Sequence, residues 1–239
     1  MKPRRTIMPA SPFAICGMTR PYRSDGSVNL LEFGEVGELG GHRMGQVELG
    51  PAVEGIAPAR VDILVVGYAD SPSVAGTVGL VRDGDRVIVV DPGMVKSRSL
   101  ILDPLERLGI SADDVTHVFV SHHHLDHTVN IALFRRAEIV DFRSVRRDDQ
   151  VNAHPGEGFQ IGPNTTIWVT PGHSPQDASL VVDTADGRHA FTHLWWRSDR
   201  TPEVDPYSTD TDALTRNRQR LLAGVDVVIP GHGAPFRVR

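Results

Sequence analysis

The sequence predicts an α/β domain in which two stacked mixed sheets carry helices on their outer faces. Three observations predict it. β-branched runs alternate with helical segments from residue 61 onward, isolated histidines follow several of these runs, and 40% of the 239 residues are hydrophobic. Such a chain can bury one large core, and nothing in its composition suggests several folded domains.

The chain changes in composition near residue 60. Residues 1–60 contain nine glycines and six prolines and show no sustained apolar periodicity. We therefore expect an N-terminal arm that is partly disordered or packed on the core, followed by the folded domain of residues 61–239. The lone cysteine, Cys16, excludes an internal disulfide, and no apolar run resembles a signal peptide or a membrane span. These features predict a cytoplasmic protein.

The first half of the domain begins with antiparallel strands, because Asp83-Gly84 between two β-branched runs is a hairpin signal. Residues 97–108 have apolar side chains at helical spacing, and Gly109 follows as a stop. A second helix is predicted over residues 128–136, directly after a histidine-rich stretch. The strands predicted in this half are residues 61–68, 77–82, 86–90, 115–120 and 139–142.

The second half follows the same logic. A hairpin turn is predicted at residues 185–187, and residues 211–223 have the pattern of an amphipathic surface helix. The strands predicted in this half are residues 165–170, 179–183, 189–192 and 225–229.

A cluster of metal-ligand residues follows the buried run at 115–120 and is written His-x-His-x-Asp-His. His122 and His124 are two apart and project to the same side of an extended segment. Asp126 and His127 are adjacent, so on the following turn they can reach a second centre. Catalytic zinc usually takes three protein ligands and a water, and paired metal ions lie roughly 3.5 to 4 Å apart. The pattern therefore predicts two metal ions, which need further ligands from elsewhere.

Two Pro-Gly-His tripeptides offer those ligands, because His173 and His232 each follow an apolar run. Proline ends a strand, and glycine lets the backbone come close to a ligand. Taken alone, either residue could be a histidine whose ring nitrogens are hydrogen-bonded within a turn. The repetition of the same setting favours metal binding by both. The remaining histidines that lack such a setting are interpreted as ordinary polar residues: His42, His117, His123, His154 and His189.

These motifs resemble the signature of the metallo-beta-lactamase superfamily, over roughly residues 61–239. The resemblance implies a four-layered αβ/βα sandwich and a site for two zinc ions, with iron or manganese as alternatives. The ligands that it implies are His122, His124 and His173 for the first metal, and Asp126, His127 and His232 for the second.

One position departs from the family pattern. The family places a bridging aspartate after the strand that follows the third ligand, where this chain has His193. A neutral imidazole offers one lone pair and no charge, so it cannot bridge two metals as a carboxylate does. We hypothesise that His193 is a terminal ligand of the second metal or a donor behind it, with that metal held more weakly; simple lining of the pocket is the alternative.

The predicted chemistry is hydrolysis, since a water between two divalent ions loses a proton near neutral pH. Asp126 is expected to orient the resulting hydroxide and to pass a proton to the leaving group, besides ligating. The residues next to His173 and His193 are candidates for the pocket wall: Ser174, Gln176, Trp195 and Trp196. For the two tryptophans, core packing beside a strand end is the alternative.

The predicted substrate is a small ester, thioester or lactone. Animal proteins that the chain resembles within the superfamily are associated with ribonuclease action, which makes RNA phosphodiester hydrolysis the first alternative. The formal net charge of -5 argues against RNA, whereas five arginines between residues 135 and 147 argue for it. A non-catalytic metal-binding scaffold or sensor is the second alternative. No membrane partner is expected, and a homodimer stays open.

Overall fold

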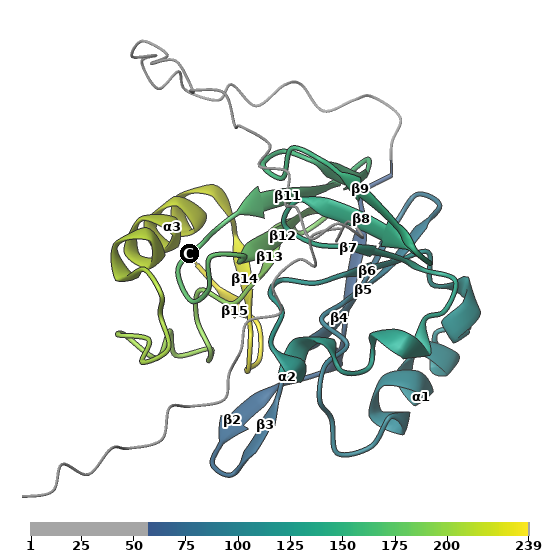
Figure 1. Cartoon of the computed structure of the whole chain (residues 1–239), viewed down its shortest axis with the longest axis horizontal. Coiled ribbons are helices and arrows are strands. Elements are labelled where there is room, and N and C mark those ends of the chain that lie inside the picture. The colour runs from purple at the N-terminus through teal and green to yellow at the C-terminus, as the bar shows by residue number, and fades with distance from the viewer. Residues whose placement is uncertain (1–56, 239) are drawn as a thin grey trace, which may run out of the picture. The chain divides into compact units, whose positions relative to one another are not determined.

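The computed structural model describes residues 57–238, which lie within one compact unit of residues 52–239. Two sheets face each other in this unit, with α1 (Ser99–Arg107) outside the first and α3 (Thr211–Gly224) outside the second (Figure 1). The predicted N-terminal arm lies almost wholly outside the described residues, as does His42. No helix within residues 57–238 is long and apolar enough to cross a bilayer.

The first sheet has seven strands. β5, β6 and β7 run parallel, so their carboxyl ends lie at one edge of the sheet. In spatial order the strands are β1 (Arg60–Val65), β4 (Val78–Asp83), β5 (Arg86–Val90), β6 (His117–Phe119), β7 (Glu138–Val140), β8 (Ser144–Arg147) and β9 (Gln150–Ala153).

The second sheet has six strands and one parallel pair, β13 with β14. Its order is β10 (Gln160–Gly162), β11 (Thr165–Val169), β12 (Ala178–Thr184), β13 (Gly187–Thr192), β14 (Val227–Pro230) and β15 (Phe236–Arg237). A small hairpin, β2 (Tyr68–Asp70) with β3 (Ser73–Ala75), contacts α2 (Leu125–Thr128).

The strand pattern explains the layers, because successive side chains of a strand point to opposite faces. In β5, Val90 lies in the core between the sheets, whereas Val89 packs with the residues of α1. In β12, Leu180 faces that inner core and Val181 packs with the residues of α3. Both sheets are therefore buried on two faces, and the predicted α/β class with its four layers is confirmed.

Two predicted elements are wrong. The helix predicted over residues 128–136 is absent, and the chain instead forms the single turn α2 and the 3₁₀ turn Ile131–Leu133. Asn130 explains the break, because its backbone N–H donates to the carbonyl of Pro92 and its side chain donates to that of Gly93. These contacts hold the chain against the loop after β5 and end the helix early.

The strand predicted over residues 61–68 is split between β1 and β2. It breaks at Gly67, where a Cβ atom would lie 2.5 Å from the backbone nitrogen of Thr77. The hairpin β2–β3 that follows was not predicted, and neither was the hairpin β8–β9.

Candidate metal centre

The predicted ligands all follow the carboxyl ends of strands, at one edge of the two sheets. The first sheet supplies those after β6, and the second supplies those after β11, β13 and β14. In chain order they are His122, His124, Asp126, His127, His173, His193 and His232. The parallel pair β13 and β14 brings His193 and His232 together within the second sheet. The loop after β6 belongs to the first sheet and meets them because the two sheets face each other.

Three imidazole nitrogens meet in the first half of the cluster. Nδ1 of His124 lies 3.1 Å from Nε2 of His122 and 3.1 Å from Nε2 of His173. Zinc–nitrogen bonds of 2.0–2.1 Å in a tetrahedral site would separate the ligand atoms by roughly 3.3 Å. The spacing therefore suits a tetrahedral metal ion.

The second half of the cluster joins His127, His232 and Asp126. The Asp126 carboxylate lies 3.5 Å from Nε2 of His232 and 3.6 Å from Nε2 of His127. Nε2 of His193 lies 3.1 Å from Nε2 of His232. These atoms offer a second set of nitrogen and oxygen ligands.

His193 belongs to both halves. Potential ligand atoms of His122, His173 and His193 lie within 4.8 Å of one another, and so do those of His127, His193 and His232. Its side chain is almost completely buried, and its Nδ1 atom has no hydrogen-bond partner. The imidazole therefore lies between the two groups of candidate ligands.

Apart from His193, every predicted histidine ligand except His124 has a hydrogen-bond partner on the ring nitrogen that points away from the cluster. Nδ1 of His127 lies 3.0 Å from the Asp91 carboxylate, and Nδ1 of His173 lies 2.8 Å from that of Asp205. Such carboxylate–histidine pairs fix the tautomer and the ring orientation of metal ligands. Neither aspartate was predicted from the sequence, although Asp91 does end a strand as the ligands do.

The other two partners are a hydroxyl and a backbone carbonyl. Ser121 donates its hydroxyl hydrogen to Asp91, and so its oxygen accepts from Nδ1 of His122 at 3.1 Å. The carbonyl of Ala75 accepts from Nδ1 of His232 at 2.9 Å. A backbone carbonyl in a distant hairpin leaves no signal in the sequence.

These bonds fix which nitrogens carry protons. With Nδ1 of His122 and of His173 both donating, each Nε2 atom presents a lone pair to Nδ1 of His124. His124 can donate a proton to only one of them, so at least one of the two 3.1 Å contacts has no hydrogen between its two nitrogens. Such a contact is repulsive unless a cation lies between the atoms. The donor set therefore fits bound metal, as does the buried, unpartnered Nε2 atom of His127.

Burial keeps most of these imidazoles neutral, which is the form that binds metal. Desolvation, with neighbouring imidazoles adding to it, holds the pKa values of His122 and His193 well below their ordinary range. Burial also lowers the pKa of His232 to about 4. His127 differs: burial would lower its pKa, but the Asp91 carboxylate raises it above the ordinary value.

Glycine permits the closest backbone approaches at the site. A Cβ atom at Gly231 would lie 2.4 Å from Cδ2 of His193, and one at Gly93 would lie 1.7 Å from the carbonyl oxygen of Asp126. The predicted reason for glycine in the Pro-Gly-His tripeptide at 230–232 is therefore confirmed at Gly231.

His123, which lies between two predicted ligands, points to a different partner. Its Nε2 atom lies 3.1 Å from the buried Asp141 carboxylate, which also accepts from Arg146 at 2.6 Å and from the Ser144 hydroxyl at 2.8 Å. These bonds hold the pKa of Asp141 far below its usual range even though burial opposes them. Asp141 thus anchors the ligand-bearing loop to the end of β7.

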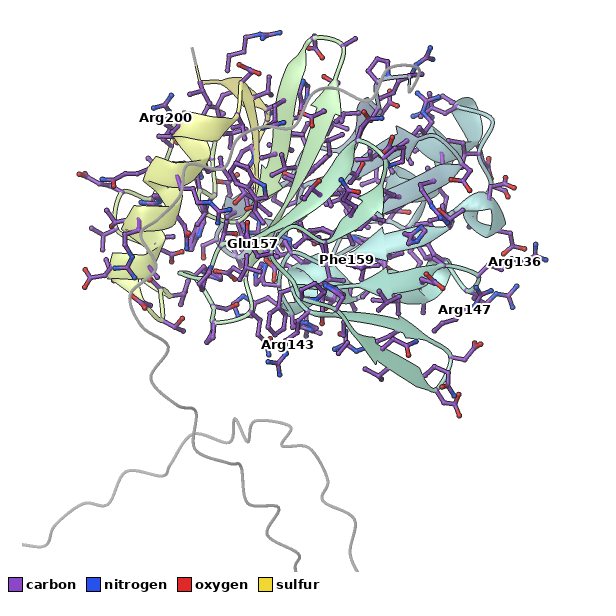
Figure 2. The ribbon with its side chains drawn as sticks, turned by 90° about the horizontal axis from the view of Figure 1, so that it is seen from above. Arg136, Arg143, Arg147, Glu157, Phe159 and Arg200 are labelled. Atoms are coloured by element: carbon purple, nitrogen blue, oxygen red, sulfur yellow. The ribbon has the colours of Figure 1, made fainter. Side chains whose placement is uncertain are left out.

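The arginines between residues 135 and 147 do not form one basic surface. Arg146 is paired with Asp141, and Arg147 lies 3.9 Å from Glu138. Arg143 lies over the ring of Phe142, apart from Arg136 and Arg147 (Figure 2). The interpretation of these arginines as a nucleic-acid contact gains no support from this arrangement.

A cavity of about 410 Å³ opens above the cluster, and Trp196 forms part of its wall. Two of the predicted wall residues, Ser174 and Gln176, are wrong, and for Trp195 the alternative of core packing is confirmed. Trp195 is buried in the outer core against Phe236, the Ser174 hydroxyl donates to Asp177, and Gln176 does not line the cavity. Tyr207 and the β2–β3 hairpin line it instead, and neither was predicted.

Two facing sheets covered by outer helices, with histidines and an aspartate gathered at one edge, define the metallo-beta-lactamase fold class. The chain belongs to the metallo-beta-lactamase superfamily, whose family model matches residues 72–233. Members of this fold family bind divalent metal ions, typically zinc, and most are hydrolases.

Similar proteins carry the same domain. Metallo-beta-lactamase domain-containing protein 1 of Xenopus laevis is 34% identical over 194 residues, which cover 76% of this chain and 83% of the frog protein. The human protein of that name is 37% identical over 159 residues, 63% of this chain and 59% of its own length. A crystal structure from Thermotoga maritima shares the fold, with a TM-score of 0.57 and 22% identity over 75% of this chain and 99% of that one.

Proposed function

We propose that the chain is a dinuclear metal-dependent hydrolase that cleaves a small ester, thioester or lactone. The observation that carries the proposal is the pair of buried histidine triads that share His193 at the floor of the cavity. A purely structural metal site is closed by four protein ligands, whereas this cluster opens into a cavity large enough for a small molecule.

Two groups of side chains would hold the metal ions. His122, His124 and His173 would hold the first, and Asp126, His127 and His232 the second, with His193 beside both. Two divalent ions there would supply hydroxide near neutral pH, since zinc alone lowers the pKa of a bound water to about 7.

The remaining chemistry falls to the protein's own groups. The Asp126 carboxylate is partly exposed at the cavity floor, where it can accept the proton of the attacking water and pass it to the leaving oxygen or sulfur. Asp91 and Asp205 hold the rings of His127 and His173 in one orientation, so the ligand nitrogens need no rearrangement.

The test is turnover by zinc-loaded protein on a panel of uncharged esters, thioesters and lactones, with single-stranded RNA in parallel. Chelation and His122→Ala should each abolish hydrolysis of the preferred substrate. His189→Gln is the matched control, because His189 lies on β13 and pairs with Asp186 away from the cluster. Hydrolysis that survives chelation contradicts the proposal, and so does full metal loading with no turnover, which would favour a scaffold.

A further inference from the structure

The cavity above the metal-binding groups has two walls of different origin. The β2–β3 hairpin contributes small and apolar residues, among them Ala69, Pro72 and Val74. Trp196 and Tyr207 form a second, aromatic part of the wall, with their rings stacked at a centroid distance of 5.8 Å and an interplanar angle of 10°. The floor consists of the ligating side chains themselves.

The walls carry no cation. Within residues 57–238, the side chains lining the cavity include no lysine or arginine, and the only carboxylate among them is that of Asp126. A nearby arginine, Arg197, is engaged on the hairpin, where it donates to the carbonyl of Ala69 and to the Asp70 carboxylate. An anionic group held along these walls would therefore lose its hydration without gaining a charged partner.

Trp196 is positioned as a rigid aromatic surface beside the floor. Its indole Nε1–H donates to the Asp205 carboxylate at 3.2 Å. Its ring centroid lies 6.2 Å from that of His193 and 6.0 Å from that of His232. A tryptophan fixed in this way offers a large apolar contact that costs little side-chain entropy on binding.

We infer that the substrate is an uncharged acyl compound whose apolar acyl group lies against Trp196, with its scissile carbonyl over the histidine floor. The inference rests on the proposed function and narrows it. It excludes acyl groups on carriers with several negative charges. It also disfavours RNA, because the phosphates that flank the scissile bond would lie along described walls that carry no positively charged side chain.

The first test compares one acyl group on carriers of different charge. Phenylacetyl thioesters of N-acetylcysteamine, glutathione and coenzyme A present the same scissile bond on carriers whose net charge is zero, one negative unit or several negative units. For zinc-loaded full-length protein, kcat/KM should be at least about tenfold higher for the uncharged thioester, the scale at which a mismatched site discriminates. A preference for either charged thioester, or faster cleavage of RNA, would overturn the inference.

The second test locates the acyl group. Trp196→Ala should raise KM for the uncharged thioester by roughly 10- to 100-fold, and Trp196→Phe should raise it less because a ring remains. Trp195→Phe is the control, since Trp195 lies in the outer core and does not line the cavity. Equal effects of Trp196→Ala and Trp195→Phe on KM would contradict the placement.

A binding measurement separates this inference from the proposed function. The uncharged ketone analogue of the thioester, which cannot be hydrolysed, and the same ketone bearing a carboxylate are titrated into zinc-loaded protein by calorimetry. Tighter binding of the uncharged ketone supports the inference even if no thioester is turned over, in which case only the hydrolase proposal fails. Equal or tighter binding of the carboxylate overturns the inference.

Discussion

Asp205 and His173 form a carboxylate–histidine pair, with 2.8 Å between Oδ2 and Nδ1, and the same oxygen accepts from Trp196 at 3.2 Å. Both Asp205 and His173 are almost fully buried, so solvent does not compete for these bonds. One carboxylate therefore orients a metal ligand and the aromatic wall of the cavity together. A substitution of Asp205 should therefore alter the orientation of both His173 and Trp196.

Asp205→Asn should weaken binding of the first metal by roughly 10- to 100-fold, the usual effect of removing a partner behind a ligating histidine. Zinc affinity is measured by competition with a chromogenic chelator. The control is Asp210→Asn: Asp210 caps α3 by accepting from the backbone of Ala213, and asparagine caps a helix equally well, so this change should leave zinc affinity unaltered. Unchanged zinc affinity in Asp205→Asn would contradict the assigned role.

His193→Asp should tighten binding of the second metal, and His193→Ala should weaken it. A carboxylate between two cations reduces their repulsion. The attraction between two opposite unit charges 4 Å apart is about 4 kcal/mol at an effective dielectric constant of 20. Even after the cost of burying the charge, we expect at least a tenfold gain, about 1.4 kcal/mol. Zinc titration by calorimetry gives the stoichiometry and both affinities. Two equally tight ions in the native chain and in His193→Ala would show that His193 is no ligand.

Gly231→Ala should displace His193, because the added Cβ would lie 2.4 Å from its Cδ2 atom. We expect a loss of about 1–3 kcal/mol in the free energy of unfolding, as for an overpacked core position, together with weaker zinc binding. The measurements are urea unfolding without metal and zinc titration. At Gly233 an added Cβ would come no closer than 3.1 Å to any neighbour, so Gly233→Ala should cost less. Identical behaviour of the two variants would refute the steric explanation.

Asp141→Asn should destabilise the metal-free protein by about 1–3 kcal/mol at neutral pH, because a buried charge that is paired and hydrogen-bonded is lost. The folded state holds the pKa of Asp141 below the ordinary aspartate value of 3.8, so this stabilisation is present above that value. The stabilisation is lost as the pH falls from that value toward the pKa of Asp141 in the folded protein. Denaturant unfolding at several pH values should therefore show the unfolding free energies of the two proteins converging in acid.

Exposed Asp186 is the control, and Asp186→Asn should cause no measurable change in the unfolding free energy. A pH-independent difference between native and Asp141→Asn would contradict this account.

The sequence alone predicted the fold class, most strands and the histidines and aspartate that the structure gathers at one edge of the sheets. Apolar periodicity places β5 and β12 because side-chain alternation is a local property, and the His-x-His-x-Asp-His motif is local too. The helix predicted over 128–136 failed because Asn130 bonds to the loop after β5, and such a contact between distant segments overrides helical preference.

Only the tertiary structure decided what surrounds those ligands. Asp91, Asp205 and the carbonyl of Ala75 lie up to 157 residues away from the histidines that they hold, and no spacing rule connects such positions. The same holds for the cavity, where adjacent Trp195 and Trp196 face opposite ways, one into the outer core and the other to the floor of the site. Sequence patterns record which groups a segment carries, whereas the packing of both sheets at one edge determines which of those groups meet.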